Sequence, residues 1–101
     1  MAVEPIVVAV DRNLEDLMPV FLAQRKADQA ALAAALPLCD FDVRRNTGHG
    51  MAGAGAIYGF DPLSNLGGRL VQAARAGDAV ALGLLREEFD HYLARLVVKY
   101  V

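Results

Sequence analysis

Residues 40–62 read DFDVRRNTGHGMAGAGAIYGFDP, and the conformation of this stretch decides the fold. Its glycines at 48, 50 and 53 fit the GxGxxG pattern of a phosphate-binding loop, which would make the chain a dinucleotide-binding α/β protein. The same residues can instead form part of one helix that presents a histidine. The two interpretations predict different folds and different functions.

The residues flanking the glycines favour the helix. A dinucleotide loop follows a buried strand and precedes an acidic residue by about 20 positions. Here residues 41–47 are polar, and residues 69–71 are Arg-Leu-Val. Asp40 is a typical N-cap, and Gly59 followed by Phe60 is typical of a Schellman ending. We therefore expect one helix that runs from about Asp40 to Tyr58.

Similar boundary signals predict three more helices. An apolar stripe that begins at Leu14 predicts a first helix, which Pro37 ends. Asp61 is expected to be the N-cap of a third helix, with Pro62 at its first position. Gly77 and Asp78 then separate this helix from a fourth. The fourth helix carries apolar residues at spacings of three and four: Leu82, Leu85, Phe89, Tyr92 and Leu96.

The predicted helices are joined by connections of only a few residues, and short connections favour antiparallel neighbours. We therefore expect an all-α fold, an antiparallel up-down four-helix bundle with a short N-terminal extension. Residues 1–101 form one domain in this interpretation, because the chain is long enough for only one hydrophobic core. The β-branched segments Ile6–Val8 and Val97–Val98 could extend and pair beside one another.

Composition narrows the classes of partner. Ten Lys and Arg against twelve Asp and Glu give a net charge of −2 with no basic stripe, which argues against binding to nucleic acid or to an anionic membrane. Cys39 is the single cysteine, so neither an internal disulfide nor a thiolate metal site is expected. We expect a cytoplasmic monomer without a secretory signal, a membrane span, a metal or a cofactor.

Helical geometry indicates what the glycine-rich helix presents. At 100° per residue, Thr47, Met51, Ala54 and Tyr58 share one face, which we expect to be the core stripe, and His49 points nearly opposite. The neighbours of His49 on the outer face are expected to be Arg45 and Asn46 before it, and Ala52, Gly53 and Ala56 after it. Small residues there leave space for a phosphoryl group or for another protein. Geometry alone favours the simpler interpretation, an incidental surface histidine beside glycines that serve helix packing.

The segment 48–61, followed by Leu63-Ser64 and Gly67, resembles the signature of histidine-containing phosphotransfer (Hpt) domains. In that family, His-x-Leu/Met-Lys-Gly opens a Gly- and Ala-rich helix that ends at Gly-Phe. The resemblance extends to residues 16–22, to Ala73-Ala74 and to Tyr92-Leu93, and thus covers nearly the whole chain. The family fold is an antiparallel helical bundle, as the boundary signals also predict.

The resemblance implies that His49 accepts a phosphoryl group from the aspartyl phosphate of a receiver domain and passes it to another receiver. The expected partners are response-regulator receiver domains and an upstream hybrid histidine kinase. The receiver would supply Mg²⁺ and a charge-stabilising lysine, so the chain would be a phosphocarrier and not an enzyme. Gly50, Ala52, Gly53 and Ala56 would keep the approach to His49 open.

The sequence departs from the family pattern at two positions. The lysine that usually follows the histidine by three residues is Ala52 here, and the usual Gln or Glu on the next helix is Val71. Arg45 is the best candidate for the missing positive charge, and Gln72 lies next to the second position. The alternative is therefore a degenerate module that binds receivers or other proteins without efficient phosphotransfer.

Overall fold

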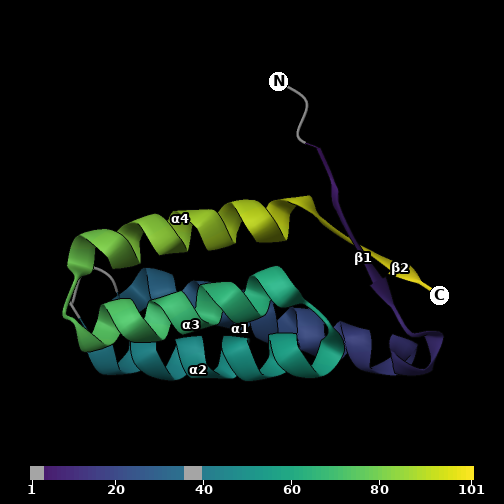
Figure 1. Cartoon of the computed structure of the whole chain (residues 1–101), viewed down its shortest axis with the longest axis horizontal. Helices are drawn as coiled ribbons and strands as arrows, with labels where there is room; N and C mark the ends of the chain where they lie inside the picture. Colours follow the sequence, from purple (N-terminus) through teal and green to yellow (C-terminus); the bar gives the residue numbers. More distant parts are fainter. Residues whose placement is uncertain (1–3, 36–39) are drawn as a thin grey trace.

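The computed structural model of this chain describes residues 4–35 and 40–101, and this part of the protein is mostly helical. Its elements, in chain order, are β1 (Ile6–Val10), the 3-10 helix η1 (Arg12–Leu17), α1 (Met18–Ala35), α2 (Phe41–Tyr58), α3 (Asp61–Arg75), α4 (Ala79–Arg95) and β2 (Leu96–Tyr100). Figure 1 shows the helices lying alongside one another, with the strand pair at one end of the molecule. The expected four helices are confirmed. Pro37, the expected end of the first helix, and Cys39 lie outside the described residues.

Several predicted helix boundaries are confirmed by their capping hydrogen bonds. The backbone N–H of Val43 donates to the Asp40 carboxylate (3.2 Å), and that of Ala81 donates to the Asp78 carboxylate (3.0 Å). Gly59, after the end of α2, has a φ of 80°, the left-handed conformation that glycine adopts most readily. These local signals set the limits of α2 and the start of α4.

The predicted start of α3 is wrong by one residue. Phe60 is the N-cap residue, and Asp61 and Pro62 are the first two residues of the helix. The carbonyl of Phe60 accepts the first helical hydrogen bond from the N–H of Ser64 (3.0 Å), and no side chain caps this end. Phe60 is completely buried, so packing of its ring in the core fixes the start of the helix, where sequence alone favoured a polar cap.

The hydrophobic core lies between the helices and contains aromatic side chains from α1, from the last residue of α2 and from the turn that follows it. The ring of Phe21 lies 4.6 Å from that of Phe60 and 5.1 Å from that of Tyr58, measured between centroids. The most deeply buried apolar side chains are Val10, Met18, Leu32, Met51, Phe60, Leu63, Leu66, Leu70, Leu82 and Phe89.

Helices α2 and α3 pack unusually closely because glycines replace side chains at their contact. A Cβ atom on Gly55 would lie 2.6 Å from the backbone nitrogen of Ser64, and one on Gly67 would collide with the backbone of Ala52. As the residue number rises along α2 it falls along α3, so this pair of helices is antiparallel. The hydroxyl of Ser64 also donates to the carbonyl of Ala52 (3.0 Å).

The two terminal segments pair as a two-stranded sheet, which confirms that the β-branched ends extend beside one another. The strands are parallel, and Val7 lies opposite Val97. Side chains at even-numbered positions, such as Val8 and Val98, pack partly against the core, while those at odd-numbered positions face outward. The N–H of Val101 donates to the carbonyl of Val10 (2.9 Å), which extends the ladder beyond β2.

Candidate functional site

His49 lies in the middle of α2, and its side chain is exposed. Helical geometry predicted that His49 would point outward, and the buried residues of α2 do lie on another face of the helix. Those residues are Arg44, Gly48, Met51 and Gly55. Within the described residues, 4–35 and 40–101, the imidazole of His49 forms no hydrogen bond and no ion pair. The imidazole is therefore available to a ligand or to another protein.

The buried stripe differs from the predicted one. Met51 is fully buried as expected, whereas Thr47, Ala54 and Tyr58 are only partly buried. Gly48 and Gly55 are buried instead, because α3 lies directly against them. The prediction used apolar side chains to identify the buried face of the helix. It therefore did not expect glycines to be buried, because their burial depends on the position of another helix.

The glycines of α2 therefore fall into two groups. Gly48 and Gly55 are packing glycines, since a side chain on either would meet the backbone of α3 or of the turn that precedes it. Gly50 and Gly53 are exposed, and a Cβ atom added to either would meet no atom within 4 Å. Packing between the helices therefore does not require these two glycines, which leave the surface beside His49 without side chains.

Ala52 and Ala56 continue this surface in different ways. Ala56 is exposed, two turns after His49. Ala52 is partly buried at the edge of the contact with α3, because its backbone lies against Gly67. The small residues near His49 thus extend from the outer surface of α2 to the seam between α2 and α3.

Two arginines precede His49, and only one has an accessible charge. Arg45 lies one turn before His49; its side chain is partly exposed, and its Nη2 lies 3.6 Å from the carboxylate of Asp42. Arg44 is 1% exposed; its Nη2 donates to the carbonyl of Ala35 (2.9 Å), and its guanidinium lies over the ring of Phe41. Arg45 is therefore the cation that this helix offers to a ligand at His49, although Asp42 already partly neutralises it.

The neighbouring helix brings Gln72, which the sequence analysis considered, and two residues that it did not select, Gly68 and Arg75. Since Gly48 lies against Leu70 and Val71, the antiparallel register places Gly68 and Gln72 near the turn of α2 that carries His49. Val71 is buried against Gly48 and has no polar atom in its side chain, so it cannot orient an imidazole. Gln72 and Arg75 are exposed. One turn further along this register, Arg75 comes to the level of Arg45. The sequence did contain a signal for this placement: the short connection at Gly59-Phe60 makes α2 and α3 antiparallel, and that register places Gly68 and Arg75 at the level of His49 and Arg45.

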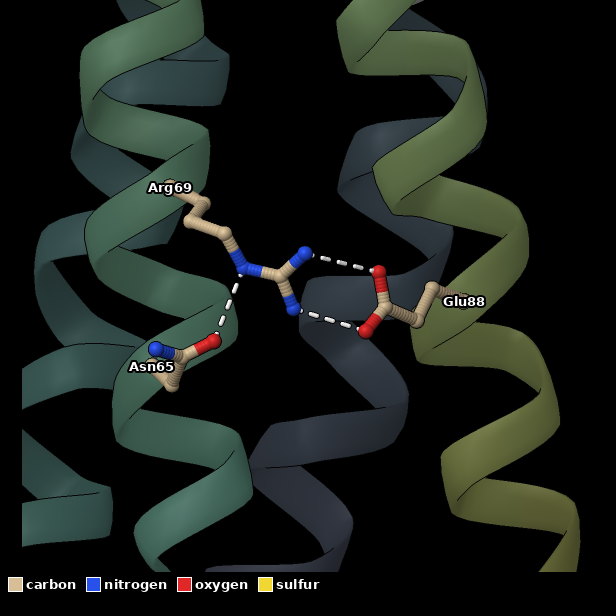
Figure 2. Close-up of polar contacts among 3 residues, drawn as sticks. All are labelled: Asn65, Arg69 and Glu88. Atoms are coloured by element: carbon tan, nitrogen blue, oxygen red, sulfur yellow. Dashed lines mark hydrogen bonds and ion pairs between the residues drawn. The ribbon is translucent and has the colours of Figure 1, made fainter.

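A second polar cluster joins α3 to α4, and the hollow beside it is lined in part by Gly68 and Gln72. Figure 2 shows Arg69 of α3 donating to both carboxylate oxygens of Glu88 of α4, at 3.0 and 2.6 Å, and to Oδ1 of Asn65 at 2.8 Å. The hydrogen bonds to Glu88 raise the pKa of Arg69 above its usual range. The hollow beside this cluster has a volume of about 800 Å³, and its lining residues belong to α3, α4 and the turn between them. His49 is not one of them.

No group of three His, Cys, Asp or Glu side chains within residues 4–35 and 40–101 is arranged to hold a metal ion. In the same part of the chain, no helix combines the length and apolar character needed to cross a bilayer. Comparisons of this chain with protein-family models, with curated proteins and with solved structures found no match.

Proposed function

We propose that this protein is a histidine phosphocarrier of a two-component phosphorelay, and that His49 carries the phosphoryl group. The observation that supports this most directly is an exposed imidazole in mid-helix beside two glycines, Gly50 and Gly53, that helix packing does not require. A surface of this shape allows a second protein to bring a phosphorylated side chain to the ring. The resemblance of residues 48–67 to Hpt domains supports the same function.

In the proposed reaction, the unprotonated ring nitrogen of His49 attacks the phosphorus of an aspartyl phosphate on a receiver domain. The bond between phosphorus and the aspartate oxygen breaks as the N–P bond forms, and the imidazole releases its proton to water. Transfer to a second receiver reverses these steps. Phosphoryl transfer depends mainly on positioning and charge stabilisation, and the receiver would supply the Mg²⁺ and the lysine. This chain would supply the nucleophile and an unobstructed approach.

The remaining site residues have supporting roles in this proposal. Arg45 would place positive charge near the phosphoryl oxygens, and Gly50, Ala52, Gly53 and Ala56 would form the surface on which the receiver rests. The helices would form an antiparallel up-down bundle that holds α2 rigid while the receiver docks. The partners would be response-regulator receivers and an upstream hybrid kinase, acting in the cytoplasm.

A transfer assay tests this proposal. Receiver domains from the same organism are phosphorylated with a small-molecule donor, freed from the donor, and mixed with the purified protein. We expect an acid-labile phosphoryl group to appear on the protein and to be absent from His49→Gln. His91→Gln is a matched control, because His91 is the other histidine of the chain and is also exposed. The proposal fails if no receiver transfers label, or if His49→Gln is labelled as strongly as His91→Gln.

A second candidate function is a receiver-binding module that transfers phosphate poorly. Two observations favour it: Asp42 partly neutralises Arg45, and the buried Val71 offers no hydrogen bond to the imidazole. This function predicts that the complex with a receiver forms and survives His49→Ala, while no label is transferred. Labelling and binding measured on the same protein preparation therefore separate the two functions.

A further inference from the structure

One edge of the two-stranded sheet is unpaired. Within residues 4–35 and 40–101, β2 is the only strand beside β1. The carbonyl of Val10 accepts from Val101, so the backbone of Val10 faces β2. Successive residues of a strand direct their backbone groups to opposite edges, and the N–H and C=O groups of Val7 and Ala9 therefore face the free edge.

This edge lacks the features that usually prevent strands from pairing with other molecules. Natural edge strands carry charges, internal prolines or bulges, or are covered by another element. The sequence of β1 is IVVAV, with neither a charged residue nor a proline. Val7 is 57% exposed and lies opposite Val97, which is 46% exposed, so the outer face beside the edge is also apolar.

We propose that β1 pairs in antiparallel fashion with β1 of a second copy of this chain, about a two-fold axis that passes through Val8. Val7 of each copy then lies opposite Ala9 of the other, and the sheet becomes four-stranded in the order β2-β1-β1-β2. A two-fold axis makes the same edge serve both copies, which is the commonest form of homodimer. This inference departs from the monomer expected from the sequence, and it does not depend on the proposed phosphotransfer.

Backbone chemistry selects this register over its two neighbours. If Val7 faced Val7 of the second copy, Ala9 would lie opposite Pro5, which has no N–H to donate. If Ala9 faced Ala9, Val7 would lie opposite Asp11, whose carbonyl already accepts from the N–H of Leu14 (2.9 Å). With Val7 opposite Ala9, every backbone group on the free edge has a partner.

The charges at the two ends of the strand indicate that the occupant is a second copy. In the same register, Glu4 of one copy lies directly opposite Arg12 of the other, and the two-fold axis produces this pair twice. Both residues are exposed. The N–H of Arg12 donates to the carbonyl of Val101 (3.0 Å), so the chain is still in the ladder at this point. Oppositely charged residues that face each other across antiparallel strands stabilise the pairing.

Sedimentation velocity tests the dimer at protein concentrations from about 1 µM to about 1 mM. This is the range of dissociation constants expected for so small an interface. We expect a reversible dimer whose share rises with concentration. Ala9→Pro removes an N–H that faces the free edge and leaves the bonds to β2 intact, so it should lose the dimer. Ala9→Thr keeps that N–H and should retain it. Circular dichroism checks that both variants are folded.

A charge exchange tests the register. Glu4→Arg and Arg12→Glu should each weaken the homodimer, because each places like charges opposite one another. An equimolar mixture of the two variants should form a heterodimer, in which both cross-strand pairs again carry opposite charges. The proposal is overturned if the wild-type protein stays monomeric at all concentrations, if folded Ala9→Pro dimerises like the wild type, or if the mixture associates no better than the separate variants.

Discussion

A Cβ atom on Gly48 would lie 2.7 Å from the carbonyl oxygen of Gly67, so the backbones of α2 and α3 are in direct contact at this point. Real Cβ atoms do not approach a backbone oxygen this closely, and the Cβ of the core residue Leu70 lies only 3.0 Å from the same added atom. The glycine-rich sequence of α2 is therefore in part a requirement of packing. This relationship makes the two groups of glycines in α2 experimentally separable.

Gly48→Ala should destabilise the protein by about 1–3 kcal/mol, the usual cost of overpacking a tight contact. Gly50→Ala is the matched control in the same helix, because nothing lies within 4 Å of its added Cβ. It should stabilise the protein by about 0.5–1 kcal/mol through helix propensity. Urea unfolding followed by circular dichroism measures both changes. Equal effects of the two substitutions would contradict the close contact between α2 and α3.

Gly53→Leu should separate phosphotransfer from folding. The position is exposed, with open space around it, one turn after His49. Leucine there should raise helix stability while it obstructs the surface on which a receiver would rest. We expect the rate of phosphoryl transfer to fall by about tenfold or more, which corresponds to a loss of about 1.4 kcal/mol of interaction with the receiver.

Leucine at position 83 provides the control for Gly53→Leu. Gly83 lies on α4, on a different helix from His49, and its added Cβ would meet no atom within 4 Å, so Gly83→Leu makes the same replacement away from the proposed site. It should leave the transfer rate unchanged. A Gly53→Leu protein that is stable and transfers phosphate at the wild-type rate would show that the glycine surface is not the docking surface.

Ala52→Lys should increase transfer if the missing positive charge limits it. Ala52 is partly buried at the edge of the α2–α3 contact, and a lysine side chain is long enough to carry its ammonium group out to solvent near His49. A hydrogen bond to a charged group contributes about 1.5–3 kcal/mol, so a gain of about tenfold or more in the transfer rate is expected. Ala52→Met has a similar length without charge and should give no gain. Equal rates for the two variants would exclude the charge as the cause.

The sequence was sufficient to predict the helices and their ends where a local signal defines them. Asp40, Gly59 and Asp78 act through hydrogen bonds or a backbone conformation that each residue determines by itself, and all three were placed correctly. The start of α3 was misplaced because it depends on burial of Phe60, which is a tertiary effect. Local chemistry was therefore a reliable guide at these three positions. Two other predictions were wrong: Leu14, expected at the start of the first helix, lies in the 3-10 helix η1, and Leu96, expected on the fourth helix, is the first residue of β2.

The site was predictable to a similar extent. Helical periodicity alone placed His49 on the exposed face, since the direction of a side chain follows from its position in the helix. Periodicity did not distinguish the packing glycine Gly48 from the open glycine Gly50, because that distinction depends on where α3 lies. It also did not predict that Arg44 would be buried, or that Asp42 would pair with Arg45. The roles of these residues depend on neighbours that no local pattern specifies.

Glu88→Gln should reveal how much the bridge from α3 to α4 contributes. Arg69 and Glu88 are both about half-exposed, so their interaction should contribute only about 0.2–1 kcal/mol to stability at low salt. The loss on substitution should shrink as salt is raised, because ions screen exposed charges. Glu87→Gln removes a neighbouring exposed carboxylate that forms no ion pair within residues 4–35 and 40–101. Glu87→Gln should lower stability less than Glu88→Gln does. An equal loss of stability in the two variants would mean that the change in net charge, and not the loss of the Arg69–Glu88 ion pair, is responsible.

The pH dependence of stability should show a contribution from Asp28. Burial raises the pKa of this carboxyl above its ordinary 3.8, although the charge of Arg25 and the hydrogen bonds from Gln24 and Arg25 oppose the shift. A raised pKa means that the folded protein binds the proton more tightly than the unfolded chain does. The stability of the wild type relative to Asp28→Asn should therefore be highest below pH 3.8, fall as the pH rises from 3.8 to the raised pKa, and stay constant above it. Urea unfolding of both proteins across this range measures the difference, and titration of the Asp28 carboxyl carbon by NMR gives the pKa directly. A pKa at or below 3.8, or a difference that rises with pH, would show that the pairing with Arg25 outweighs the burial of Asp28.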